Sequence, residues 1–285
     1  MLRMRAVPVV LACLIAAHGG TLAAGDAAGQ KQAALRVVHL TDFHCASATA
    51  NPRPRFLFDV GTKDLVASFE LLEAAVRDIN ESVKPALVVI TGDLTDRRGD
   101  LASLQRVKAA LDKLKAPYYP VIGNHDDRAT WRRVFGPQRL NYTFSHGGWR
   151  FLAVDTSSGR LDGAAMAWLA RELRSDAAAP TVLLTHYPVA VPDAFIALAR
   201  RYYGVSLLLG NAVDVLKLLA GAPNVRAVLA GHCHIPVETS VRGISHIVTP
   251  CLIGPAHLFR VLELRGDQLR SELRSIPSPA PVRPP

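Results

Sequence analysis

Cysteine is scarce in this sequence, and its pattern excludes two kinds of small protein. The 285 residues contain 4 cysteines and no Cys-x-x-Cys pair. A chain of this length with so few cysteines is not a disulfide-stabilised scaffold, and no thiolate zinc knot is indicated. Internal repeats are absent, and so is any run of 18 apolar residues after the N-terminus. We therefore expect no transmembrane segment in the mature chain.

Acidic side chains are outnumbered by basic ones, which indicates the charge of the molecules that the protein binds. Lys and Arg total 33 against 24 Asp and Glu, a net charge of +9. This excess favours anionic partners such as phosphate esters, nucleic acid or lipid headgroups, with a merely basic surface as the alternative. No helix combines a basic face with interleaved aromatic residues, so we expect a small phosphate-ester substrate and no specific nucleic-acid partner.

Both ends of the chain differ from its middle. Arg3 and Arg5 precede an apolar stretch and then small residues, a pattern typical of a secretory signal peptide over residues 1–24. We therefore expect a periplasmic or secreted protein, and the short apolar stretch before Cys13 argues against lipoprotein anchoring. Residues 277–285 are rich in proline and predict a disordered tail. One domain over residues 35–276 remains.

Apolar runs and amphipathic segments alternate along this domain. Buried strands are predicted over residues 37–40, 87–90, 118–122, 182–184 and 225–230, and helical periodicity runs through 65–79, 101–114, 166–173 and 212–219. This alternation argues for an α/β fold with a largely parallel core. Turn residues at Gly147-Gly148, Arg242-Gly243 and Gly266-Asp267 predict antiparallel hairpins, so the sheets should be mixed.

Polar side chains follow five of the predicted strands. They are Asp42 and His44, Asp93, Asn124 and His125, His186, and His232 and His234. Ligands of open α/β sheets bind beyond the carboxyl ends of the strands, so these side chains should meet. Without His125 they offer seven nitrogen and oxygen donors, too many for one tetrahedral zinc site. They suit two ions that share a carboxylate, the pair of metals used for displacement at phosphorus.

The order of these motifs resembles a known family. Asp-x-His, Gly-Asp, Gly-Asn-His-Asp, a lone His and Gly-His-x-His follow one another as in the calcineurin-like metallophosphoesterases, over about residues 35–250. Residues 123–128 together with 152–156 and Trp168-Leu169 are similar to the bacterial cyclic-nucleotide phosphodiesterase branch. The resemblance implies a four-layer αββα sandwich with two mixed β-sheets and a dimetal site at the C-terminal ends of the strands.

The resemblance also implies how the metals are held. Asp42, His44 and His234 bind one ion, Asn124, His186 and His232 bind the other, and Asp93 bridges both. The ions are two divalent or trivalent metals (Mn, Fe or Zn), and a metal-bridging hydroxide is the nucleophile.

Residues 124–128 contain four candidates for further roles, and the resemblance assigns those of His125 and Asp126. His125 assists the leaving group instead of binding metal, and Asp126 orients it; alternatively, Asp126 caps the helix that begins near Arg128. Arg128 and Asn124 are the candidates for substrate contact. A disulfide between Cys45 and Cys251 near the site is conceivable.

The function expected from the resemblance is dimetal-dependent hydrolysis of a phosphodiester or a nucleotide-type substrate. A phosphomonoesterase or a lipid phosphoesterase is the alternative. A non-catalytic metal-binding scaffold is an alternative of another class, but it should have a broken ligand set or a replaced His125, and this sequence has neither. Residues 45–61 look particular to this chain, so the resemblance does not carry the substrate of the cyclic-nucleotide enzymes over to it.

Overall fold

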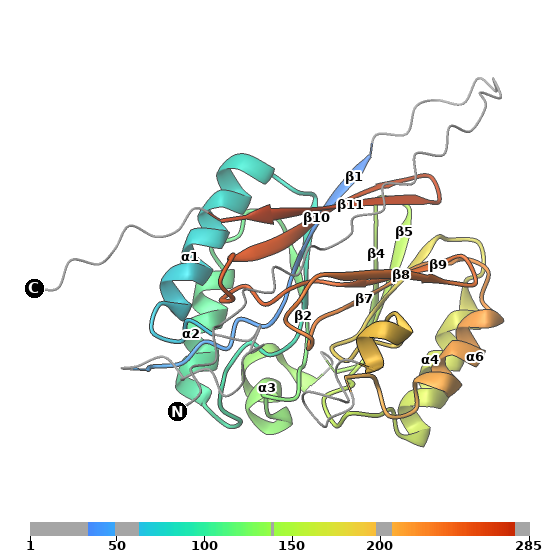
Figure 1. The fold of residues 1–285 in the computed structure, drawn as a ribbon, viewed down its shortest axis with the longest axis horizontal. Coiled ribbons are helices and arrows are strands. Elements are labelled where there is room, and N and C mark those ends of the chain that lie inside the picture. The colour runs from blue at the N-terminus through green and yellow to red at the C-terminus, as the bar shows by residue number, and fades with distance from the viewer. Residues whose placement is uncertain (1–33, 49–62, 138–139, 198–206, 277–285) are drawn as a thin grey trace, which may run out of the picture. The chain divides into compact units, whose positions relative to one another are not determined.

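The structure is a computed structural model that describes residues 34–48, 63–137, 140–197 and 207–276. The predicted signal peptide (1–24), the predicted tail (277–285) and most of segment 45–61 lie outside the described residues. The described part of the chain forms two β-sheets with helices on their outer faces (Figure 1).

The first sheet has the strand order β11-β10-β1-β2-β3. Its strands are β1 (Leu35–Leu40), β2 (Leu87–Thr91), β3 (Tyr118–Val121), β10 (Leu258–Arg265) and β11 (Gln268–Ser275). Strands β1, β2 and β3 are parallel, with Val38 opposite Val88 and Val88 opposite Tyr118. Strand β10 lies antiparallel to both β1 and β11, so this sheet is mixed as predicted.

The second sheet has the order β4-β5-β6-β7-β9-β8. Its strands are β4 (Tyr142–His146), β5 (Trp149–Ala153), β6 (Thr181–Leu184), β7 (Val225–Ala230), β8 (Val237–Val241) and β9 (Ile244–Val248). Strands β5, β6, β7 and β9 are parallel, and β4 and β8 each form an antiparallel hairpin with a neighbour. The three hairpins predicted from turn residues are therefore confirmed.

Helices cover the two outer faces, which makes four layers (Figure 1). Helices α1 (Ser68–Asp78), α2 (Leu101–Leu111) and α3 (Arg128–Phe135) pack on the first sheet, and α4 (Gly163–Ser175) and α6 (Ala212–Ala220) pack on the second. Along β1, Val38 and Leu40 face the helices while Val37 faces the other sheet. Burial on both faces explains why the parallel strands are continuous apolar runs in the sequence.

One helix is longer than the sequence predicts. The helix expected over residues 65–79 begins at Ser68 and continues as a π-helix, η1 (Ile79–Val83). The side-chain amide of Asn80 donates to the carbonyl of Lys113 and accepts from the amide of Lys115, both at 2.8 Å. These two bonds tie the added turn to the segment after α2, a long-range contact that hydrophobic periodicity does not encode.

Candidate metal centre

The polar residues that follow five strands lie together where the two sheets end. Asp42, His44, Asp93 and His234 form one group of donor atoms, all within 4.8 Å of one another, and Asp93, His186 and His232 form a second. We call these the first and the second donor group. Asn124 joins the second group, since its Oδ1 lies 2.9 Å from Nε2 of His186. The structure thus brings all seven predicted ligands together.

Asp93 belongs to both groups through a single oxygen. Its Oδ2 lies 3.6 Å from Nε2 of His44 and 3.3 Å from Nε2 of His186. The other oxygen, Oδ1, accepts a hydrogen bond of 2.8 Å from the backbone amide of His125. One oxygen is thereby fixed by the backbone, and the other faces a nitrogen of each group. This is the arrangement that a carboxylate shared between two cations needs.

The two oxygens of the Asp42 carboxylate also have different kinds of partner. Its Oδ2 accepts hydrogen bonds from the Thr41 hydroxyl at 2.6 Å and from the His232 amide at 3.0 Å. Its Oδ1 lies 3.3 Å from Nε2 of His234 and 3.7 Å from Nε2 of His44. The two bonds to Oδ2 orient the carboxylate, which leaves Oδ1 facing the imidazoles of the first donor group.

The backbone is in a sparsely populated conformation at most of these positions. Positive φ angles occur at Asp42 (53°), His44 (42°), Asp93 (53°), His232 (69°) and His234 (59°). A residue with a side chain in this region costs free energy and persists only where its surroundings enforce it. Five such residues in one cluster are typical of a functional site.

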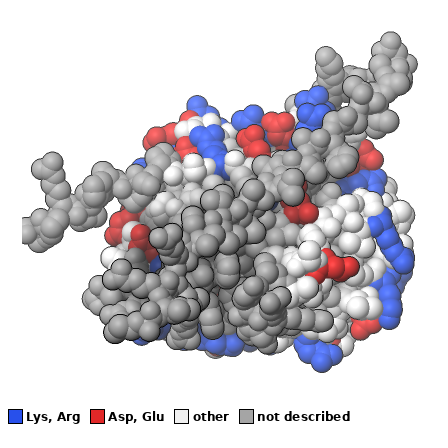
Figure 2. Space-filling view, in the orientation of Figure 1, with Lys and Arg blue, Asp and Glu red and all other residues white. Residues whose placement is uncertain are grey.

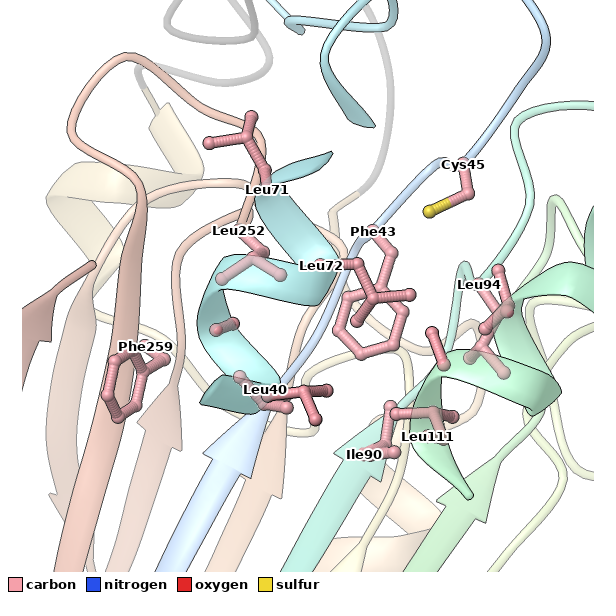
Figure 3. Packing of buried hydrophobic residues seen from close by; sticks show 14 of the residues in the cluster. Leu40, Phe43, Cys45, Leu71, Leu72, Ile90, Leu94, Leu111, Leu252 and Phe259 are labelled. Atoms are coloured by element: carbon pink, nitrogen blue, oxygen red, sulfur yellow. The ribbon is translucent and has the colours of Figure 1, made fainter. Parts of the chain in front are cut away.

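Hydrogen bonds and burial enforce the backbone conformation of the Asp-x-His segment. The amide of Asp42 donates to Gly92 O at 3.0 Å, and the amide of His44 donates to Asp93 O at 2.9 Å. Between them Phe43 is fully buried, and its ring points into the apolar cluster toward Leu72 of α1 (Figure 3). Anchoring of the middle residue in the core leaves the flanking carboxylate and imidazole for the site.

Glycine is required at two positions because the backbone touches the donor atoms. A Cβ on Gly123 would lie 2.2 Å from Oδ1 of Asp93. A Cβ on Gly231 would lie 2.0 Å from the Thr41 hydroxyl and 2.4 Å from Oδ2 of Asp42. Any side chain at these positions would displace a carboxylate of the cluster.

Backbone carbonyls fix the orientation of two imidazole rings. His186 Nδ1 lies 2.7 Å from the carbonyl oxygen of Thr91, and His125 Nδ1 lies 2.7 Å from that of Asp96. A carbonyl only accepts, so each Nδ1 carries the proton and each Nε2 has a free lone pair in the neutral ring. Nε2 of His186 faces the donor cluster. The His125 ring packs edge-on against His44, with 4.6 Å between the ring centroids.

The buried carboxylates give the cluster an affinity for positive charge. Burial opposes ionisation of Asp42 and Asp93, but the surrounding histidines hold the pKa of both carboxyls well below its usual range. Burial also disfavours a charged His186, yet Asp93 and Asp42 raise its pKa to about 9. Buried carboxylates with converging imidazole Nε2 atoms fit two borderline transition-metal ions, since this donor set favours Zn, Mn, Fe or Co over Ca or Mg.

The expected role of Asp126 in orienting His125 is wrong, because the Asp126 carboxylate bonds elsewhere. It is buried and accepts hydrogen bonds from the backbone amides of Leu94, Thr95 and Gly123 at 2.9 to 3.3 Å. The alternative of a helix cap is wrong too, since Asp127 caps α3 by accepting from Ala129 N and Thr130 N. Burial and the charge of Asp93 raise the pKa of Asp126 to about 6. Asp126 therefore ties together the loops after β2 and β3.

The remaining residues singled out from the sequence are Arg128, Cys45 and Cys251, and each has its own partner in the structure. Arg128 begins α3, and its Nε donates to the buried carboxylate of Asp155 at 2.7 Å. Cys45 and Cys251 are free thiols: Sγ of Cys45 contacts Ser68 O and Sγ of Cys251 contacts Asp42 O, so no disulfide joins them.

Two residues beside the cluster were not found from the sequence. Lys63 Nζ lies 3.0 Å from Nδ1 of His44 and 3.1 Å from Oδ1 of Asp96. Asp96 lies three residues after Asp93 on the same loop, and its carbonyl accepts from His125. Proximity to the Gly-Asp motif was a usable signal for Asp96. No sequence signal marked Lys63.

Comparison with known proteins gives the family. The model of the family described as calcineurin-like phosphoesterase matches residues 35–236. A cAMP/cGMP dual specificity phosphodiesterase of Mycobacterium tuberculosis is 28% identical over 227 residues, covering 70% of this chain and 69% of the relative. The 3',5'-cyclic adenosine monophosphate phosphodiesterase of Escherichia coli is 25% identical over 257 residues, covering 83% and 87%. A glycerophosphodiester phosphodiesterase of Enterobacter lignolyticus is 22% identical over 233 residues, covering 77% and 78%.

Solved structures agree on the fold. A dimetal phosphatase from Danio rerio superposes with a TM-score of 0.68 at 17% identity, covering 86% of this chain and 97% of the other. A purple acid phosphatase from yellow lupin superposes with a TM-score of 0.59 at 17% identity, covering 86% and 52%. Within the described residues, none of the helices has the length and apolar character needed to cross a membrane. The chain therefore belongs to the calcineurin-like phosphoesterase family of phosphoester hydrolases.

Proposed function

We propose that this protein hydrolyses a phosphodiester or a nucleotide-type substrate at a two-metal centre, with His125 assisting the leaving group. The observation that carries the proposal is the pair of donor groups that share Asp93, with the His125 ring beside them. Asp42, His44 and His234 hold one ion, and Asn124, His186 and His232 hold the other. When bound, two such ions lower the pKa of water and offset the charge of a phosphate ester.

His125 is suited to donate a proton to the leaving oxygen. Its Nδ1–H is bonded to the carbonyl of Asp96, so Nε2 is the nitrogen that exchanges a proton with the substrate, and it can donate one only from the doubly protonated ring. Burial lowers the pKa of His125, which makes that protonated ring a stronger acid. Its backbone amide is bonded to Asp93, which fixes the residue relative to both donor groups. A residue held by one backbone bond and one ring bond needs little reorganisation during the reaction.

Arg128 is suited to bind a substrate oxygen. The bond from its Nε to the buried Asp155 holds the guanidinium, while the Arg128 side chain is 43% exposed. Its two Nη groups form no hydrogen bond with another described residue and remain available to an anionic oxygen. Asn124 lies four residues earlier and faces the second donor group.

The names of the relatives support a diester substrate over a monoester. The Mycobacterium tuberculosis and Escherichia coli relatives are named for cyclic nucleotides and the Enterobacter lignolyticus relative for glycerophosphodiesters, and both kinds of compound are phosphodiesters. A phosphomonoesterase or lipid phosphoesterase is the second candidate. The non-catalytic scaffold is disfavoured by the complete donor set and the placement of His125.

The visible part of the described surface carries charges of both signs (Figure 2). On the face shown in Figure 2, acidic and basic side chains are interspersed, and basic ones gather along the edge beside α4 and α6. Helices α4 and α6 pack on the outer face of the second sheet. The expectation of a small phosphate ester rests on the donor groups and on the relatives, not on this charge distribution.

A hydrolysis panel tests the proposed function. The purified protein is reconstituted with Mn, Zn or Fe, and its metal content is measured. It is then assayed on model monoesters and diesters, cyclic nucleotides, nucleotide sugars and phospholipids. We expect two ions per chain and the highest kcat/KM on a diester or a nucleotide-type substrate. A preference for monoesters or phospholipids would favour the second candidate, and a metal-loaded protein that hydrolyses none of them would favour the scaffold.

We also propose that the protein is exported to the periplasm or secreted. The support is the charged, apolar and small-residue order of residues 1–24. Cell fractionation with N-terminal sequencing should find the shortened chain outside the cytoplasm. An uncleaved cytoplasmic protein would refute export and make intracellular cyclic nucleotides available as substrates.

A further inference from the structure

The Nδ1 nitrogen of His44, which points away from the first donor group, contacts two side chains with opposite hydrogen-bonding requirements. Lys63 Nζ lies 3.0 Å from Nδ1 of His44, and Oδ1 of Asp96 lies 3.4 Å from the same atom. A lysine ammonium donates hydrogen bonds and has no lone pair, whereas a carboxylate accepts them. Nδ1 of His44 cannot satisfy both neighbours at once.

Each contact therefore selects one tautomer of the neutral His44 ring. The bond from Lys63 needs a lone pair on Nδ1 and puts the ring proton on Nε2. The bond to Asp96 needs the proton on Nδ1 and leaves the lone pair on Nε2. Nε2 is the nitrogen that faces the first donor group, 3.0 Å from Nε2 of His234.

Only one of these tautomers can ligate a cation. A metal-binding imidazole uses the lone pair of one nitrogen and donates the proton on its other nitrogen, often to a carboxylate. Asp96 is placed to accept that proton from His44. Lys63 favours the tautomer in which Nε2 is already protonated, so its bond to His44 competes with cation binding.

Lys63 is held in this position and shielded from solvent. Its ammonium forms an ion pair with Oδ1 of Asp96 at 3.1 Å, and the two side chains are 15% and 22% exposed. An ion pair with this little exposure is screened less by water and salt than a surface pair. The same ion pair also gives Lys63 a partner when it leaves the His44 nitrogen.

We propose that Lys63 is a positioning residue that weakens cation binding at the first donor group through the tautomer of His44. Cation binding there moves the His44 proton to Nδ1, where Asp96 accepts it, and Lys63 then pairs with Asp96 alone. His186 of the second donor group has no such competitor among the described residues, since its Nδ1 bonds to a carbonyl that only accepts. The two groups should therefore differ in affinity. This inference rests on the ligand role proposed for His44.

The test compares Lys63→Gln with the wild-type full-length protein. Zn²⁺ or Mn²⁺ affinity at both sites is measured by calorimetry, and the ring nitrogens of His44 are followed by ¹⁵N NMR. We expect binding at the weaker site to tighten about tenfold or more, the effect of one hydrogen bond to a charged group. In the metal-free variant the His44 signal should move toward the form protonated at Nδ1. Lys63→Arg, which keeps a donor without a lone pair, should stay closer to wild type.

A matched control separates the tautomer from simple charge removal. Arg98→Gln also removes a positive charge beside the cluster, where Nη1 of Arg98 donates to the backbone carbonyl of Asn124 at 3.3 Å. It should leave the His44 tautomer unchanged and affect affinity less than Lys63→Gln. If Arg98→Gln tightens binding as much, the effect is coulombic and the proposal is wrong.

The outcomes distinguish this proposal from the proposed function. If the wild-type protein binds two ions and Lys63→Gln changes neither the affinity nor the His44 tautomer, the role of Lys63 is refuted and the two-metal centre stands. If the wild-type protein binds no ion through His44, the ligand assignment itself is wrong.

Discussion

His125 Nδ1 donates to the carbonyl oxygen of Asp96 at 2.7 Å. This bond decides which nitrogen of the ring can act on a substrate. A carbonyl oxygen only accepts hydrogen bonds, so Nδ1 must keep its proton and Nε2 is left for the substrate. In the proposed mechanism Nε2 of His125 is therefore the atom that exchanges a proton, and the ring lies against His44 in an edge-on contact. His125 belongs to neither the first nor the second donor group, although its ring forms a further cluster of donor atoms with His44 and Asp96.

Replacing His125 by alanine should slow turnover strongly and leave the metal content unchanged. General acid assistance is worth about 10²–10⁴-fold in rate, so the loss should be of this size for a substrate with a poorly leaving alkoxide. A nitrophenolate leaving group hardly needs a proton, and its hydrolysis should slow much less. Metal content and turnover on both substrates provide the measurement.

His232→Ala serves as the comparison for His125→Ala. His232 belongs to the second donor group, so its loss should lower the metal content and slow both substrates alike. Equal slowing of both substrates by His125→Ala, with the metals retained, would instead assign His125 to electrostatic stabilisation of the phosphoryl oxygens.

Asp93→Asn should disturb both metal positions at once. The reason is that Oδ2 of Asp93 faces a nitrogen of each donor group, and an amide cannot supply the negative charge that two cations share. Reconstitution followed by elemental analysis should give markedly less than two ions per chain. A variant that loses only one ion would show that Asp93 does not bridge.

The ligand cluster could be predicted because its residues are local to strand ends. Asp42 and His44 follow β1, Asp93 follows β2 and His186 follows β6, and each strand is an apolar run that is visible in the sequence. Parallel strands place their carboxyl ends at the same end of each sheet, and the packing of the two sheets against each other brings His186 to the residues that follow β1 and β2. The motifs thus encode both the residue types and their meeting place.

The surroundings of the cluster could not be predicted, because they depend on contacts distant in the sequence. Lys63 reaches His44 and Asp96 from the segment ahead of α1, and no motif contains it. Asp126 and Asp127 are both acidic and adjacent, so sequence could not tell that Asp127 caps α3 while Asp126 bonds to the loop after β2. Such choices follow from backbone geometry that hydrophobic periodicity does not determine.

Gly231→Ala should damage the first donor group more than the fold. The added Cβ would lie 2.0 Å from the Thr41 hydroxyl and 2.4 Å from Oδ2 of Asp42, so the Asp42 carboxylate must shift. Crowding of this kind costs about 1–3 kcal/mol of stability. We expect a drop in metal content at temperatures where circular dichroism still reports a folded protein.

The control for Gly231→Ala is Gly163→Ala at the start of α4, where an added Cβ meets no atom within 4 Å. It should keep both the metals and the wild-type melting temperature, or gain a little stability from the better helix former. If Gly231→Ala also binds two ions, the close approach of backbone and carboxylate is not needed for the site.

His39 lies beneath the site and should make stability depend on pH. The ring is fully buried, with Nε2 2.7 Å from the Thr91 hydroxyl and Nδ1 2.7 Å from the Thr249 hydroxyl. Burial first, and then the charge of Arg260, lower its pKa from 6.5 to about 3, against an opposing effect of Asp42. The folded protein therefore keeps His39 neutral over a range in which the unfolded chain takes up a proton.

The sign of the pH effect follows from this difference. Between pH 6.5 and about 3 the unfolded state binds one more proton at His39, so the free energy of unfolding falls as the pH is lowered through this window. From pH 7 to pH 5.5 the His39 contribution amounts to about 1 kcal/mol. His39→Gln cannot titrate, so the difference in unfolding free energy between wild type and variant should shrink toward low pH. Urea unfolding of both proteins at several pH values measures it, and parallel curves would mean that His39 is not held neutral by the fold.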